Sequence, residues 1–163
     1  MTERALRSAA FELAALPLAF TRVRTRLRTA RRLLRVPVGA QNVSLTRCLL
    51  HAMISAGVGL LGWFLAMLAV LVLVRGLAYP LVAADGYADS WGGPTLAGAW
   101  LVHAVLGVLI APALLAVIAV LGRLQLRLTR SVLGRARSWW PVPCAVVLAA
   151  VGVVFFVAWV HQI

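Results

Sequence analysis

The sequence predicts an all-α integral membrane protein with three transmembrane helices and two basic amphipathic helix regions, one N-terminal and one mid-chain. Of its 163 residues, 63% are hydrophobic, the mean hydropathy is +0.98, and three long stretches carry no charge. A soluble domain of this length could not bury so much apolar surface, so lipid must solvate part of it. We expect a cytoplasmic amphipathic region over residues 1–40 and a three-span membrane domain over 41–163.

Residues 1–36 have the spacing of an amphipathic helix. Apolar side chains recur every three or four residues and therefore share one face. They are Leu6, Ala9, Leu13, Leu16, Phe20, Val23, Leu27, Ala30 and Leu34. Pro17 interrupts the pattern because proline lacks a backbone donor and clashes with the preceding turn, so we expect a kink or two shorter helices. The arginines of the second half cover the rest of the circumference.

Three structures compete for this N-terminal segment. It could lie in the headgroup layer with its stripe in lipid, form a coiled coil with a partner helix, or be a poorly ordered basic tail. Alanines on the stripe and like-charged flanks weaken a homodimeric coiled coil, which favours the interfacial helix. Residues 9–21 are apolar apart from Glu12 and flanking hydroxyl residues. This stretch is shorter than the roughly 20 residues that span a bilayer, so a shallow or re-entrant insertion stays open.

The three spans are expected over residues 48–74, 95–121 and 142–160. Ser55 and Gly59 in the first span form a pair of small residues four apart, a spacing that lets another helix approach closely. Pro112 should kink the second span, which we expect to continue as a basic amphipathic helix over 122–137. The tryptophans before the third span are typical of a membrane interface.

The distribution of arginine predicts the topology. All 16 basic residues are arginine, a composition typical of a GC-rich bacterial genome. Ten of them precede the first span and five lie in residues 122–137, whereas the loop over 76–94 has none and carries both aspartates. Because positive loops stay inside, we expect a protein of the bacterial plasma membrane with its N-terminus cytoplasmic and its C-terminus outside.

Two sets of residues are candidate interaction sites. The outer loop and its flanks offer a surface for a ligand or, because the loop is small, more readily a partner: Arg75, Asp85, Tyr87, Asp89, Trp91 and His103. A carboxylate beside His103 would bring its titration near neutral pH, while Arg75 could simply anchor or order the loop. The basic helices offer a face for anionic headgroups or a partner: Arg22, Arg24, Arg26, Arg28, Arg31, Arg32, Arg35, Arg123, Arg127, Arg130 and Arg137.

Several classes of function find no support in the sequence. It contains no nucleotide-binding loop, nucleophile elbow, paired catalytic carboxylates or metal-ligand spacing, so we expect no enzyme, cofactor or metal. Nearly uncharged spans argue against an autonomous transporter. Because the arginines flank the spans, they indicate lipid and topology rather than nucleic acid. Cys48 and Cys144 form neither a disulfide framework nor a metal site.

Residues 49–134 resemble the actinobacterial putative sensor domain, a membrane module often found ahead of histidine kinase cores. The resemblance rests on ADGYADSWGGPTLAGAW from Ala84 to Trp100, the following LVHA, and GRLQLRLTRSVLG from Gly122 to Gly134. It implies a sensor-like role. No kinase core and no phosphoacceptor histidine in a charged context accompany it, and the third span has no place in the family pattern. The output would therefore come from another protein.

Two hypotheses for function follow. The first is a sensor-like signalling module that passes an outer-face or bilayer signal to a separate output protein. The second is an accessory subunit of a larger bacterial membrane complex, favoured by the small outer loop and the glycine-rich first span. Both predict membrane lipids and another protein as partners.

Overall fold

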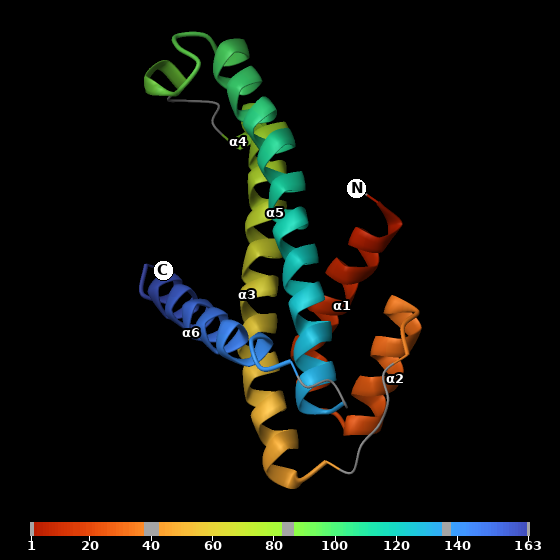
Figure 1. The fold of residues 1–163 in the computed structure, drawn as a ribbon. Helices are drawn as coiled ribbons and strands as arrows, with labels where there is room; N and C mark the ends of the chain where they lie inside the picture. The colour runs from red at the N-terminus through yellow and green to blue at the C-terminus, as the bar shows by residue number, and fades with distance from the viewer. Residues whose placement is uncertain (1, 38–42, 83–86, 135–137, 163) are drawn as a thin grey trace. The chain divides into compact units, whose positions relative to one another are not determined.

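The computed structural model describes residues 2–37, 43–82, 87–134 and 138–162, and its regular structure there is helical throughout (Figure 1). In chain order the elements are α1 (Glu3–Ala19), α2 (Val23–Leu34), α3 (Leu45–Leu77), α4 (Tyr79–Val82), the 3-10 turn η1 (Tyr87–Asp89), α5 (Leu96–Val132) and α6 (Pro141–Val160). Three of them, α3, α5 and α6, are long and apolar enough to cross a membrane. The predicted fold class and number of spans are therefore confirmed.

The helix boundaries agree with the predicted spans and extend two of them. α3 is three residues longer at each end than the predicted 48–74, and α5 continues through Pro112 to Val132. The second span and the mid-chain amphipathic helix are thus one helix, as predicted. Of its predicted apolar face, Leu121, Leu128 and Val132 are buried. α6 begins at Pro141, where a missing N–H removes no helical bond.

The N-terminal region forms two shorter helices, one of the two predicted outcomes. α1 runs through Pro17 and ends at Ala19, where hydrogen bonds of the turn replace the helical ladder. The Phe20 and Thr21 amides donate to the Pro17 and Leu18 carbonyls at 3.3 and 2.9 Å, and the Thr21 hydroxyl also donates to Leu18. The chain then turns back into α2.

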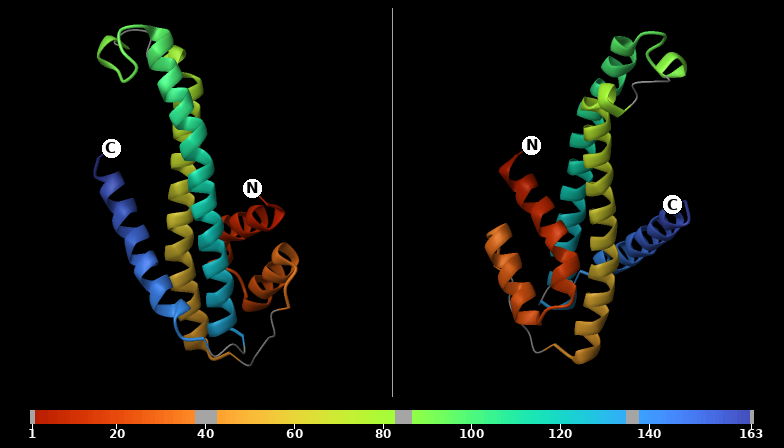
Figure 2. Two further views of the ribbon diagram at one scale, coloured as in Figure 1. Left: turned by 45° about the horizontal axis from the view of Figure 1, so that its top comes forward. Right: turned by 180° about the vertical axis from the view of Figure 1, so that it is seen from behind.

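The chain divides into two compact units, residues 1–64 with 116–163 and residues 65–115. The first unit holds α1, α2, α6 and the adjoining parts of α3 and α5. Within it, α1 and α2 lie on the opposite side of the α3–α5 pair from α6 (Figure 2). Since α3 and α5 are each unbroken helices, both contribute to both units.

α1 buries mainly small side chains, together with Phe11 and Glu12. The buried side chains of α1 are Ala5, Ser8, Ala9, Phe11, Glu12, Ala15 and Ala19. From the predicted stripe, Leu6 and Phe20 are 54% and 83% exposed. The predicted stripe is therefore divided: Ala9 is buried in the protein, whereas Leu6 and Phe20 are exposed, and their contact with lipid stays a prediction.

Three glycines of the spans form the seat of α1. A Cβ atom at Gly122 would lie 1.9 Å from the Ser8 carbonyl oxygen, at Gly62 2.8 Å from Glu12 Cγ, and at Gly59 2.8 Å from the Leu16 nitrogen. Ser8, Glu12 and Leu16 follow one another at single helical turns. The close approach expected at Gly59 is thus confirmed, and Trp63 adds a hydrogen bond from Nε1 to the Leu13 carbonyl at 2.9 Å.

Candidate functional site

The outer-loop candidates belong to the second unit. Arg75, Asp89 and Trp91 are exposed, Tyr87 and His103 are half-buried, and Asp85 lies outside the described residues. The His103 ring stacks on buried Tyr79 with 4.2 Å between ring centroids, and its Nδ1 donates to the Ala99 carbonyl at 2.8 Å. The contacts of the His103 ring given by the structure are therefore to Tyr79 and to the Ala99 carbonyl.

Tyr79 orders this loop. Its hydroxyl donates to Ser90 Oγ at 2.7 Å, so one side chain connects α4 to the turn after η1. Gly92, with φ of +112°, brings the loop against the first turn of α5, where a Cβ would lie 2.4 Å from the Gly98 carbonyl oxygen. Tyr79 was not among the residues predicted for this site.

The basic candidates form an exposed face on two helices, with one exception. Arg22, Arg24, Arg28, Arg31, Arg32, Arg35, Arg123 and Arg127 are exposed and Arg130 is half-buried, whereas Arg137 lies outside the described residues. Arg127 lies over the Trp140 ring at 5.0 Å, a cation–π distance. The exception is Arg26, which is 9% exposed and does not belong to a lipid-facing surface.

Arg26 turns inward from α2 because it shares the buried face of Leu27 and Ala30. Its Nη2 donates to the Ala19 carbonyl at 2.6 Å and its Nε to the Thr21 carbonyl at 3.0 Å. These acceptors lie at the C-terminus of α1, where carbonyls lack helical partners and the helix dipole favours a cation. Burial lowers the pKa of Arg26, and the hydrogen bonds compensate the guanidinium for lost water.

His51 carries the hydrogen bonding from Arg26 into the spans. Arg26 Nη1 lies 3.4 Å from the Cys48 carbonyl oxygen and 3.4 Å from His51 Nδ1. His51 Nε2 lies 3.1 Å from Thr129 Oγ1 on α5. Because the guanidinium is only a donor, Nδ1 accepts, and the network assigns the hydrogen of the imidazole to Nε2. His51 then donates to Thr129, which donates to the Gln125 carbonyl at 2.8 Å.

One turn further along α3, Ser55 completes the network with Gln125. Ser55 Oγ donates to Gln125 Oε1 at 3.2 Å, and Gln125 Nε2 donates to the Ser55 carbonyl at 3.0 Å. We name Arg26, His51, Ser55, Gln125 and Thr129 the polar network. All five are buried. A cavity of about 10 Å³, the room that one water needs, adjoins it between these side chains and Phe11, Ala15 and Leu18 of α1.

Glu12 is the second buried polar feature of the first unit. Its side chain is fully buried against Gly62, and neither carboxyl oxygen has a hydrogen-bond partner among the described residues. Burial without a compensating partner raises its pKa from 4.5 to about 8. The carboxyl is therefore protonated at neutral pH, and a proton can leave it only at the expense of its packing.

No family model, no curated protein and no solved structure matches this chain. The resemblance of residues 49–134 to the sensor domain stays a prediction.

Proposed function

We propose that this membrane protein is a non-enzymatic, sensor-like module that passes a change in its spans to a separate output protein. α1 and the basic helix α2 would lie at the cytoplasmic face of a bacterial plasma membrane, and the 76–94 loop would lie outside. The arginine distribution supports this orientation.

The polar network carries the proposal. It ties α2 to α3 and α5 by directional hydrogen bonds: the His51 imidazole receives one from Arg26 and gives one to Thr129. A buried network of this kind is stable only when the hydrogen-bonding groups of every member are satisfied. The network therefore either resists a relative movement of α3 and α5 or is broken by it. Breaking it would release α2 with its exposed arginines, and this supports a role for α2 as the output surface.

A photo-crosslinking experiment in native membranes tests the proposal. Arg24, exposed on α2, is replaced by benzoylphenylalanine, and buried Ala30 on the same helix serves as the matched control position. We expect one recurrent soluble protein to be captured at position 24 and not at position 30, with its yield changed when His51→Phe is added. Capture of lipid alone at position 24 would contradict the proposal.

An accessory subunit of a larger complex is the second candidate, and α6 favours it. This helix is apolar and exposed around most of its circumference, including Val147, Val154 and Phe155. Lipid or the helix of a partner can cover such a surface. Benzoylphenylalanine at Val147 would capture an integral membrane protein in fixed ratio if the chain is a subunit, and lipid if it is a sensor-like module.

A further inference from the structure

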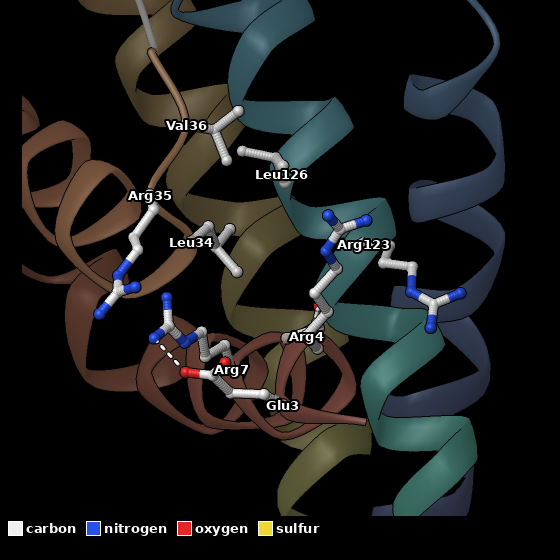
Figure 3. Close-up of a pocket in the computed structure, with 9 residues that line it drawn as sticks. Glu3, Arg4, Arg7, Leu34, Arg35, Val36, Arg123 and Leu126 are labelled. Carbon is white, nitrogen blue, oxygen red and sulfur yellow. Dashed lines mark hydrogen bonds and ion pairs between the residues drawn. The ribbon is translucent and has the colours of Figure 1, made fainter. Parts of the chain in front are cut away.

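A basic pocket opens between α1, the end of α2 and α5, outside the polar network. It has a volume of about 600 Å³ and is lined by Glu3, Arg4, Arg7, Ser8, Leu34, Arg35, Val36, Arg123 and Leu126. The arginines come from three segments of the chain (Figure 3). Two of them, Arg4 and Arg7, were not among the predicted basic residues.

The net positive charge of the pocket lining favours an anionic ligand. Four arginines and one glutamate leave a net of three positive charges around one cavity. Glu3 is bonded to Arg7, so no acid of the lining faces the other three arginines. Arginines from different segments around one cavity suit a phosphate, whose oxygens accept paired hydrogen bonds from guanidinium groups.

The rest of the lining suits an amphiphile. Leu34, Val36 and Leu126 lie among the arginines in Figure 3. Arg123 is the first charged residue of α5 after the apolar stretch that begins at Leu96. The pocket therefore lies where a span stops being apolar, the level at which phospholipid headgroups meet a membrane protein.

Arg35 holds a backbone conformation that glycine usually takes. It ends α2 with φ of 52° and ψ of 39°, the only non-glycine residue with positive φ in the described chain. A side chain is strained in this left-handed region, and helix ends there normally carry glycine or asparagine. Backbone strain of this kind is found most often at binding and active sites, and Arg35 lines the pocket.

We propose that this pocket binds a phosphate group, carried either by the headgroup of an anionic lipid or by a soluble phosphate compound. The proposal needs no output protein, so its failure would leave the proposed function standing.

The test uses the full chain in neutral detergent, with native mass spectrometry to count bound ligand and measure affinity. The probes are phosphatidylglycerol for the lipid source and inorganic phosphate for the soluble source. Arg123→Gln and Arg4→Gln each remove one pocket arginine. Arg47→Gln is the matched control, because Arg47 is exposed, lies on α3 and is not part of the pocket.

We expect saturable binding of one ligand per chain. The affinity should be about tenfold lower in each pocket variant, the effect of losing one charge-assisted hydrogen bond, and within about twofold of wild type in the control. If millimolar phosphate does not displace bound phosphatidylglycerol, the natural ligand is a lipid headgroup. If phosphate displaces the lipid, the natural ligand is a soluble phosphate compound. Binding of neither probe, or an equal loss in Arg123→Gln and Arg47→Gln, would overturn the proposal.

A second variant separates binding from folding. Arg35→Gly removes a pocket arginine and at the same time relieves the positive φ, so its thermal stability should equal or exceed that of the wild type. We expect its affinity for the probe to fall about tenfold nonetheless. An Arg35→Gly protein that binds as tightly as the wild type would contradict the proposal.

Discussion

Glu12→Gln tests whether a buried proton holds α1 against the spans. The substitution keeps the size of the side chain and its uncharged state but removes the ionisation. In the wild type the docked carboxyl has its pKa raised to about 8, whereas in water it has the ordinary 4.5. The undocked state therefore releases its proton at a lower pH than the docked state does.

The direction and size of the pH effect follow from the linkage between the docking of α1 and the protonation of Glu12. Below pH 4.5 both states are protonated and the docking of α1 is at full strength. Between 4.5 and 8 only the docked state holds the proton, so docking weakens as pH rises. The whole window amounts to about 5 kcal/mol, and the part of it between pH 6 and 8 raises the open population roughly fiftyfold.

Hydrogen exchange measures this local opening directly. Peptides of α1 are followed at pH 6, 7 and 8 in nanodiscs, with intrinsic rates corrected for pH and peptides of α6 as an internal reference. We expect the protection of α1 to fall with pH in the wild type and to be flat in Glu12→Gln. Glu3→Gln, which removes the other acid of α1, with a side chain 75% exposed, should keep the wild-type slope.

Two results would refute the reasoning. A wild-type α1 whose protection does not change between pH 6 and 8 would mean that the docked carboxyl does not hold its proton. A Glu12→Gln protein with the wild-type slope would assign the pH dependence to another group.

Three further predictions concern the packing around the sites. His51→Phe fills the space but removes two hydrogen bonds of the polar network, so a thermal melt should show a loss of about 1–3 kcal/mol. Gly122→Ala places a methyl group on the Ser8 carbonyl, and the protection of α1 should fall about tenfold in hydrogen exchange. Tyr79→Phe loses the bond to Ser90, so exchange in the 87–95 loop should increase by the equivalent of about 1 kcal/mol while α1 is unaffected.

Features that are local in the chain could be predicted from the sequence. Span length and apolarity are properties of single segments, so the three long helices were predicted within a few residues. The continuation of α5 beyond Leu121 followed from a helical pattern that did not break. The end of α1 followed from Pro17, whose effect on a helix depends on its immediate neighbours.

Features that depend on residues far apart in the chain could not be predicted from the sequence. The leucines of residues 6–20 gave the stronger pattern. Ser8, Glu12 and Leu16 nevertheless lie against the spans, because three glycines of α3 and α5 leave room for α1 there. Arg26 lies beside Leu27 on the buried face of α2, but two of its acceptors, the Ala19 and Cys48 carbonyls, belong to α1 and α3 and become its neighbours only in the fold.

A weaker signal for the polar network was present. His51 and Ser55 stand four residues apart, as do Gln125 and Thr129, so each pair shares one face of an otherwise apolar helix. Two such pairs on two spans favour contact between the polar faces. Glu12 gave a similar signal as the one acid within an apolar run.

The seat of α1 also imposes an order on biosynthesis. Residue 12 leaves the ribosome early, but Gly122, which completes the seat, is made about 110 residues later. At roughly 5–20 residues per second the first helix waits about 5–20 seconds for α5. Until Gly62 follows, about 50 residues after Glu12, the carboxyl has no protein surface to cover it and meets water or headgroups with its ordinary acidity. The nascent chain must take up a proton on this carboxyl as α1 docks, so the docking of α1 is also a protonation.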